Sequence, residues 1–308
     1  MNEIKDLIIV GAGPAGMTAA LYIARTGKSV LLFEKLAAGG QAALTHSIDN
    51  YPGFEEGING MDLSDKMRQQ VERFNVIFEY DSIESISQDT NTKIYTVISG
   101  MGNSFHAKSV LITSGTTSKR LGAKGEDKFF GRGIGTCAVC DGAFYKNKIV
   151  AVIGGGNSAL EESLYLADIA TEVYIIHRRK EFRADQFIQD RVKNHPKIKL
   201  ITDTVVEEFV GEQKLNKCIV KNIITNNVTE LILDGVFLYV GLDANTSFLD
   251  SQYKDKSGFI IVDTDNRINN NGLFAAGDCC AGTIKQVIIA CGDGAKSSYS
   301  INKYLSEI

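Results

Sequence analysis

The sequence predicts an α/β protein made of two similar strand–turn–helix units, with the second unit inserted into the first. Three observations lead to this fold class. Residues 7–25 read as a buried strand, a glycine-rich turn and a helix, and the same pattern returns 143 positions later. A short apolar strand pattern at 271–278 has no partner pattern near it in the second unit. The 308 residues are enough for two domains with a core each.

Composition narrows the function classes. The net charge is -4 and no lysine or arginine block is long enough to follow a phosphate backbone, so we expect no nucleic-acid partner. The longest apolar runs are strand-length, well short of the ~20 residues of a spanning helix. The first six residues lack the features of a signal peptide. Six cysteines are too sparse for a disulfide scaffold, and we expect a cytoplasmic protein with mostly reduced thiols.

The first unit carries a glycine turn at its strand-to-helix junction. Residues 7–10 run into GAGPAG at 11–16, and a second strand at 30–33 ends on an acid. The first glycine permits the tight turn, the second lets the backbone approach a pyrophosphate, and the third lets the helix pack on the strand. The acid is where ribose hydroxyls are bound. The predicted dinucleotide contacts are Gly11, Gly13, Pro14, Ala15, Gly16 and Glu34.

The second unit repeats this turn. Gly154, Gly156 and Ala159 fall on the three glycine positions, and the distance to the end of the next strand is equal. A helix–sheet core would explain the shared apolar residues, but not two glycine turns with the same spacing. We therefore expect two Rossmann-like units and two bound nucleotides.

The repeats differ at the end of the second strand. Glu34 of the first unit falls on His177 of the second, which is followed by Arg178, Arg179 and Arg183. Exchanging the acid for guanidinium groups removes repulsion of a 2′-phosphate and supplies bidentate partners for it. The alternative is a solvated basic loop. The first site should prefer a free ribose and the second a phosphorylated one.

A cysteine pair lies ahead of the second glycine turn. Cys137 and Cys140 are separated by two residues, which places both sulfurs on one short turn, and Asp141 follows as a candidate acid. The alternatives are half of a zinc site or two buried packing thiols. Four-ligand zinc needs a second close pair at ligand spacing. The other cysteines offer none convincingly, so we favour a redox pair and no metal: these are Cys218, Cys279, Cys280 and Cys291.

Short β patterns fill the remaining chain. They run through about 76–115 and again through 218–241, which suggests one small β layer in each unit. The strand at 271–278 ends on Asp278, whose carboxylate could accept hydrogen bonds from ribityl hydroxyls of a cofactor. Linkers are expected near 116–118 and 242–245, where the chain would cross between the two units.

The motifs together resemble the family of low-molecular-weight bacterial thioredoxin reductases, nearly end to end and in order. They are GAGPAG (11–16), GQ (40–41), NYPG (50–53), CAVCDG (137–142), GGGNSA (154–159), HRR (177–179) with Arg183, and AGD (276–278). The resemblance implies two three-layer Rossmann-like domains in a homodimer. FAD would bind a discontinuous domain of residues 1–115 and 246–308. NADPH would bind the inserted domain, residues 116–245, which carries the cysteine pair.

The resemblance also implies a reaction. Hydride would pass from NADPH to FAD and then to a Cys137–Cys140 disulfide, with Asp141 as acid/base, and the dithiol would reduce thioredoxin by exchange. Other readings are a reductase of the same family that depends on ferredoxin or serves another disulfide protein, and a non-enzymatic metal-binding or sensing flavoprotein. Lys285 stands where the family usually has arginine. The further implied cofactor contacts are Gly40, Gln41, Asn50, Gly115, Gly277, Asp278, Lys285, Gln286, Val287, Gly154, Gly156, Asn157, Ser158, His177, Arg178, Arg179 and Arg183.

Overall fold

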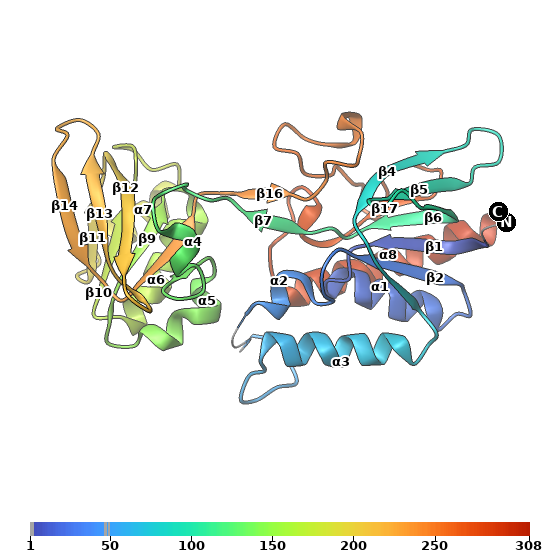
Figure 1. Ribbon diagram of the computed structural model, residues 1–308, viewed down its shortest axis with the longest axis horizontal. Coiled ribbons are helices and arrows are strands. Elements are labelled where there is room, and N and C mark those ends of the chain that lie inside the picture. Colours follow the sequence, from blue (N-terminus) through green and yellow to red (C-terminus); the bar gives the residue numbers. More distant parts are fainter. Residues whose placement is uncertain (1–2, 46–47, 49) are drawn as a thin grey trace. The chain divides into compact units, whose positions relative to one another are not determined.

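The computed structural model describes residues 3–45, 48 and 50–308 (Figure 1). Contacts divide the chain into two compact units. Unit 1 is discontinuous and consists of Met1–Thr117 and Asp243–Ile308, whereas unit 2 is the continuous segment Ser118–Leu242. Each unit is described by itself below.

Unit 1 is built on a seven-stranded sheet of order β3-β2-β1-β6-β5-β4, with β17 also paired to β6. The five strands β3, β2, β1, β6 and β17 run parallel, and β4 and β5 add an antiparallel edge. The C-terminal β17 thus completes a sheet begun at the N-terminus. The strands are β1 (Ile4–Val10), β2 (Val30–Glu34), β3 (Ile77–Tyr80), β4 (Ile83–Gln88), β5 (Tyr95–Ser99), β6 (Ser104–Ile112) and β17 (Leu273–Ala275).

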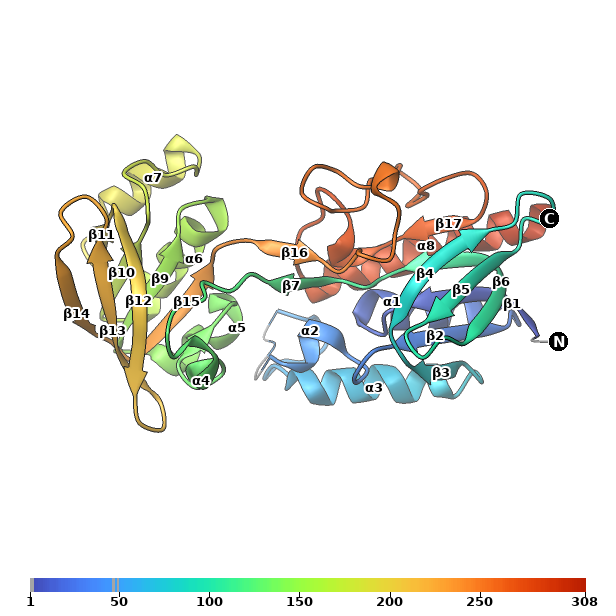
Figure 2. The same ribbon diagram turned by 45° about the horizontal axis from the view of Figure 1, so that its top comes forward.

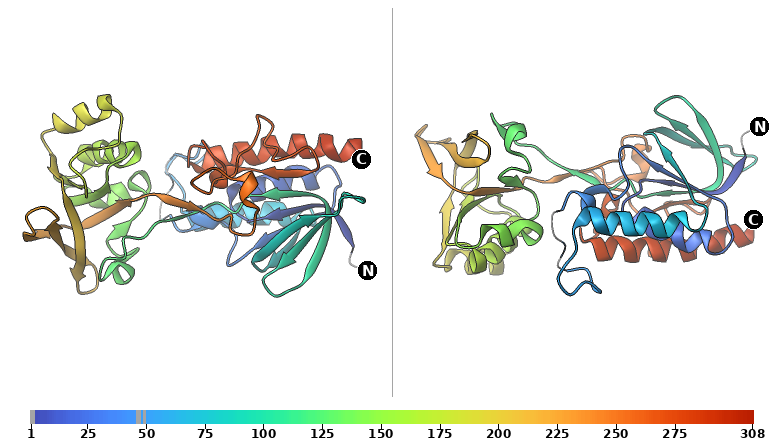
Figure 3. Two further views of the ribbon diagram at one scale, coloured as in Figure 1. Left: turned by 90° about the horizontal axis from the view of Figure 1, so that it is seen from above. Right: turned by 60° about the horizontal axis from the view of Figure 1, so that its bottom comes forward.

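Both faces of this sheet are buried, which explains the unbroken apolar run of β1. Leu7 and Ile9 face a core shared with the helices, whereas Ile8 and Val10 face a second core with β5 and the segment around Ile260. Helices α1 and α8 lie side by side on the first face (Figure 3). The helices are α1 (Pro14–Ala24), α2 (Gly40–Ala43), α3 (Gly60–Glu72) and α8 (Val287–Glu307), with 3₁₀ turns η2 (Ser251–Tyr253) and η3 (Gly277–Cys279).

Unit 2 repeats the arrangement on a five-stranded parallel sheet of order β11-β10-β9-β15-β8. A separate sheet of order β12-β13-β14 packs on one face, and helix α6 packs on the other (Figure 2). The strands are β8 (Ile134–Gly135), β9 (Ile149–Gly154), β10 (Glu172–Ile176), β11 (Ile198–Ile201), β12 (Thr204–Gly211), β13 (Leu215–Asn222), β14 (Val228–Ile232) and β15 (Gly235–Tyr239). The helices are α4 (Glu126–Phe129), α5 (Ala138–Asp141), η1 (Gly142–Tyr145), α6 (Asn157–Ile169) and α7 (Gln186–Lys193).

The predicted α/β class with two three-layer, Rossmann-like units is confirmed. Two assignments are wrong. In unit 1, β3 and β6 of the 76–115 segment are strands of the main parallel sheet, to which β4 and β5 are joined, so these strands form no separate layer. In unit 2, the small β layer does not extend through 218–241. It begins earlier, at β12, and ends with β14, while β15 inserts between β9 and β8 of the parallel sheet. The buried, unbroken apolar run of β15 fits a sheet covered on both faces.

The chain crosses between the units twice, through β7 (Thr116–Ser118) and β16 (Leu242–Ala244), which pair as a two-stranded sheet. Beside this pair, the Lys119 N–H donates to the Gly241 carbonyl at 3.0 Å, and the Asn245 N–H donates to the Gly115 carbonyl at 3.0 Å. Among the residues that the structure describes, no helix combines the length and apolar composition needed to cross a bilayer.

Candidate nucleotide and dithiol sites

The first glycine turn has the geometry that its three glycines predict. A Cβ added at Gly11, where φ is +108°, would lie 2.4 Å from the Thr113 carbonyl oxygen. A Cβ at Gly16 would lie 2.0 Å from the Gly11 oxygen, so α1 packs on the turn as closely as backbone allows. A Cβ at Gly13 would meet nothing within 4 Å, because this glycine faces open space. The N-terminus of α1 is therefore accessible to an anion.

Glu34 ends β2 beside this turn. Its Oε2 accepts a hydrogen bond from the Ala12 N–H at 3.0 Å, and its Oε1 accepts one from the Leu36 N–H at 3.1 Å. The carboxylate is half-buried and fixed by two backbone donors. Each oxygen keeps a further lone pair, which suits it to accept hydrogen bonds from a ribose diol.

The chain returns to the turn at its C-terminal end. A Cβ at Gly277 would lie 2.9 Å from the Ala15 Cβ, so the segment after β17 lies directly against the start of α1. Next to it, the Oδ1 atom of Asp278 is buried without a hydrogen-bond partner among the described residues. Burial raises the pKa of this carboxyl, and the Lys285 charge opposes that effect. An unpartnered acceptor here fits a hydroxyl-bearing ligand.

The Lys285 side chain is engaged with nearby backbone, and its predicted cofactor contact stays a prediction. Its ammonium donates to the carbonyl oxygens of Asp278 at 2.7 Å and Cys280 at 3.2 Å, and it lies 4.9 Å from the centre of the Phe259 ring. The lysine thus holds the backbone of the turn that presents Asp278. Cys279 and Cys280, on the same turn, are free and buried.

Of the other predicted residues of unit 1, Gly40 lies beside the first glycine turn, and Asn50 contacts Gln286. The Asn50 amide donates to the Gln286 Oε1 atom at 2.8 Å, which joins the 50–53 loop to the start of α8. A Cβ at Gly40 would lie 3.4 Å from the Gly13 Cα. The remaining residues are placed as follows: Gln41 in α2, Gly115 with φ of +65° after β6, Pro14 and Ala15 at the start of α1, and Val287 as the first residue of α8.

The second glycine turn closes on β15 and on the loop after β10. A Cβ at Gly154 would lie 2.6 Å from the Tyr239 carbonyl oxygen, whereas a Cβ at Gly156 would meet nothing within 4 Å. Asn157 opens α6, but its side chain is engaged with Asp185: its Nδ2 donates to the carboxylate at 2.9 Å and its Oδ1 accepts from the Asp185 N–H at 2.8 Å. Ser158 is the second residue of the same helix.

Arg178, Arg179 and Arg183 follow β10 and are all exposed. Within the described part of the chain, none of their guanidinium groups forms a hydrogen bond or an ion pair with protein. His177 differs from them, because only 6% of its surface is exposed. Three free, clustered guanidinium groups fit a phosphate ligand.

The cysteine turn is short and anchored. Cys137 is disulfide-bonded, and the Asp141 N–H donates to its carbonyl oxygen at 3.1 Å. The Ala138 N–H donates to the Tyr239 hydroxyl at 2.7 Å, which ties the turn to β15. The negative charge of Asp141 contributes, after burial, to raising the pKa of Tyr145 to about 12. The side chain of Cys140 lies outside the described part of the structure.

Sequence reasoning missed two contacts: the Tyr239 hydroxyl accepts from the cysteine turn, and the Phe182 ring stacks on the His177 ring. Tyr239 lies in an apolar strand pattern and Phe182 in a basic loop, so neither carries a local signal of its role. Their contacts depend on how β15 and the loop after β10 fold onto the glycine turn.

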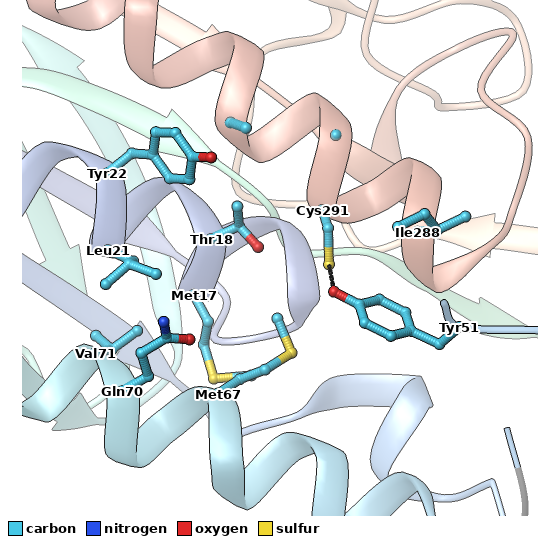
Figure 4. Close-up of a pocket in the computed structure, with 12 residues that line it drawn as sticks. Met17, Thr18, Leu21, Tyr22, Tyr51, Met67, Gln70, Val71, Ile288 and Cys291 are labelled. Carbon is cyan, nitrogen blue, oxygen red and sulfur yellow. Dashed lines mark hydrogen bonds between the residues drawn. The ribbon is translucent and has the colours of Figure 1, made fainter. Parts of the chain in front are cut away.

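A pocket of about 470 Å³ opens between α1, α3 and α8 of unit 1 (Figure 4). Met17, Leu21 and Met67 supply much of its apolar lining, and at one side the Tyr51 hydroxyl donates to the Cys291 sulfur at 3.8 Å. Burial, together with Cys291, raises the pKa of Tyr51 to about 12. No described residue that lines the pocket carries a charge.

Two glycine turns together with a cysteine turn are typical of a known class of flavoprotein reductase. The chain is a member of the pyridine nucleotide-disulphide oxidoreductase family, whose pattern matches residues 5–294. Members that are thioredoxin reductases use FAD and NADPH. Within the described residues, no group of three His, Cys, Asp or Glu side chains could hold a metal ion.

The relatives that resemble this chain include thioredoxin reductases. The chain is 42% identical to "Thioredoxin reductase" of Helicobacter pylori J99, over 97% of this chain and 98% of that one. It is also 42% identical to the Listeria innocua protein of the same name, over 100% and 96%. Among solved structures, thioredoxin reductase from Streptococcus pyogenes MGAS5005 is 38% identical with a TM-score of 0.89, and that from Giardia duodenalis is 31% identical with 0.88. The match to the Streptococcus pyogenes structure covers 100% of both chains, and the match to the Giardia duodenalis structure covers 99% of this chain and 100% of that one.

Proposed function

We propose that this protein is an NADPH-dependent thioredoxin-disulfide reductase, with FAD on unit 1, NADPH on unit 2 and Cys137/Cys140 as its redox pair. The observation that carries the proposal is the combination of two glycine turns of opposite ribose preference with a Cys-x-x-Cys turn in one chain. Its full-length identity of about 40% to thioredoxin reductases supports the same conclusion.

The residues of unit 1 fit FAD. Glu34 would bind the ribose of the adenosine half, and the accessible start of α1 beside Gly13 would bind the pyrophosphate. The unpartnered Oδ1 of Asp278 would accept a hydrogen bond from the ribityl chain. The linked pair Asn50 and Gln286 lies at the start of α8, where amide groups would meet polar edges of the ring system.

The residues of unit 2 fit NADPH. Gly156 leaves room for a pyrophosphate at the start of α6. The guanidinium groups of Arg178, Arg179 and Arg183 are free to bind a 2′-phosphate, and no acid stands at the position that Glu34 holds in unit 1. The same arginines argue against a ferredoxin-dependent reductase, in which this site would have no substrate.

When bound, the flavin supplies the conversion of a hydride into the electron pair that a disulfide accepts. With two electrons and two protons the Cys137–Cys140 disulfide becomes a dithiol, and Asp141, adjacent to Cys140, would take up and return the thiol proton. One thiolate then attacks a sulfur of the thioredoxin disulfide. The second thiol resolves the mixed disulfide, the protein disulfide re-forms and thioredoxin leaves as a dithiol.

The test is an anaerobic titration of the FAD-loaded protein with NADPH and then NADH, followed by addition of thioredoxin and a reporter disulfide. We expect NADPH to bleach the flavin absorbance far more effectively than NADH, and turnover to depend on thioredoxin. Cys140→Ser should abolish turnover but leave bleaching intact, whereas Cys218→Ala, which removes a free buried thiol, should retain both. Thioredoxin reduction by the Cys140→Ser variant would refute the dithiol route.

We further propose a cytoplasmic homodimer. The four cysteines Cys218, Cys279, Cys280 and Cys291 are free thiols, which suits a reducing compartment. The dimer rests on the resemblance to the family. Light scattering coupled to size exclusion tests it, because a mass near that of one 33.5 kDa chain would contradict a dimer.

A further inference from the structure

The imidazole of His177 is buried although its chain neighbours Arg178 and Arg179 are exposed. His177 directly follows β10, at the position where unit 1 has the ribose-binding acid. A histidine that contacts a bound nucleotide would expose its ring nitrogens on the surface of the unbound protein. The burial of this ring therefore requires another explanation, which its contacts supply.

The ring is held between an aromatic side chain and a glycine. It stacks on Phe182 with a centroid distance of 5.2 Å and an interplanar angle of 18°. On the glycine side, a Cβ added at Gly155 would lie 2.3 Å from its Cε1 atom and within 2.6 Å of both ring nitrogens. The Nε2 atom lies 3.2 Å from the Glu181 carbonyl oxygen, so it too faces protein.

The segment after His177 is tied to the glycine turn at two more points. The Arg183 N–H donates to the Gly155 carbonyl oxygen at 2.7 Å. The reciprocal hydrogen bonds of Asn157 and Asp185 fix the end of the segment to the start of α6. The arginine loop, residues 178–183, is thus closed onto the same turn that would bind the pyrophosphate.

We propose that His177 is a positioning residue that sets the preference for a 2′-phosphorylated nucleotide without contacting it. Its ring, stacked between Phe182 and Gly155, holds the arginine loop so that Arg178, Arg179 and Arg183 converge on one phosphate. The inference rests on the proposed NADPH site of unit 2. It reassigns His177 from a cofactor contact to the support of three such contacts.

The electrostatic surroundings agree with this role. Burial lowers the pKa of His177, the hydrogen bond to Glu181 opposes that effect, and the charges of Arg183, Arg179 and Arg178 lower it further. All three guanidinium groups therefore lie close enough to act on one imidazole. A neutral ring adds no charge to a phosphate site, but it lets three cations assemble around it at less electrostatic cost.

The test measures binding of two probes to the full-length, FAD-loaded protein by calorimetry: adenosine 2′,5′-bisphosphate, which carries the 2′-phosphate, and 5′-AMP, which lacks it. In His177→Ala we expect the affinity for the bisphosphate to fall about tenfold, the equivalent of one charge-assisted hydrogen bond, with 5′-AMP binding unchanged. Phe182→Leu should give the same selective loss from the other side of the stack. His195→Ala, in the same unit, is the control and should change neither affinity.

Two results would overturn the positioning role: retained bisphosphate affinity in both variants, or equal losses for the two probes, which would indicate general damage to unit 2. His177→Phe keeps a flat ring and should therefore retain most of the preference for the bisphosphate over 5′-AMP. The proposed function is tested separately by thioredoxin reduction with NADPH. If the wild-type protein bound both probes equally, the 2′-phosphate site itself would be wrong, whatever the variants did.

Discussion

Replacing Asp278 by Asn should separate the stability of the protein from its affinity for FAD. The Oδ1 atom of Asp278 is buried and unpartnered among the described residues, and burial raises the pKa of the carboxyl. A carboxylate with a raised pKa in the folded state costs stability at neutral pH. The neutral, nearly isosteric amide removes that charge. In the flavin complex, however, the same carboxylate would accept a charge-assisted hydrogen bond that the amide makes less well.

The magnitudes follow from these two effects. The substitution keeps a buried acceptor but removes a buried charge, which is costlier to bury than a neutral amide. The gain is small because Asp278 is half-buried and the Lys285 charge compensates its charge in part. We expect the apoprotein of Asp278→Asn to gain about 1 kcal/mol, which corresponds to roughly 2–4 °C in melting temperature. Losing most of a charged hydrogen bond of ~1.5–3 kcal/mol should weaken FAD binding by roughly 10- to 100-fold.

The pH dependence has a definite sign. Because the folded-state pKa of Asp278 is raised, its cost to stability is present above that pKa and disappears as the pH falls towards the ordinary value of 3.8. The melting-temperature gap between the variant and the wild type should therefore close on acidification. Calorimetry of apoprotein across pH, with FAD reconstitution followed by fluorescence quenching, measures both effects. A variant that is less stable as apoprotein, or that binds FAD as tightly as the wild type, would contradict the assignment.

Three further changes test other contacts. Arg183→Ala should raise the KM for NADPH about tenfold and leave that for NADH unchanged, because one guanidinium–phosphate contact is lost; equal changes in steady-state assays would sink the 2′-phosphate assignment. Tyr239→Phe should lower stability by ~1–3 kcal/mol, because the buried Ala138 N–H loses its acceptor, and an unaltered denaturant midpoint would disprove that cost. Gly155→Ala should lower the apoprotein melting temperature through collision with His177, whereas Gly156→Ala, with open space around it, should leave it nearly unchanged.

The sequence predicted the parts of the site that depend on local spacing. The strand, glycine turn, helix and terminal acid of unit 1 lie within about thirty residues, so their geometry follows from backbone rules at Gly11, Gly16 and Glu34. The arginines of unit 2 were predicted by comparing its sequence with that of unit 1. These assignments needed no knowledge of how distant segments pack.

Features set by distant contacts were not predictable. The place of β15 between β9 and β8 depends on strand order, which an apolar run of five residues does not encode. The hydrogen bond between the Tyr239 hydroxyl and the cysteine turn could therefore not be predicted from the sequence. Lys285 is similar: the resemblance implied a cofactor contact there, whereas nothing in the sequence predicted that its side chain would bind two carbonyl groups of the turn before α8. Such roles depend on which acceptors lie within reach after folding.

The pairing of β7 with β16 makes unit 2 an insertion that could be removed or exchanged with little disturbance of unit 1. Since the two crossing segments are hydrogen-bonded neighbours, the inserted unit leaves and re-enters unit 1 at almost one point. A short turn would span the gap left by its removal, and a cassette with similarly close ends would fit in its place. Interruption of the N-terminal sheet for 125 residues (118–242) therefore leaves the pairing of β17 with β6 within reach of the chain.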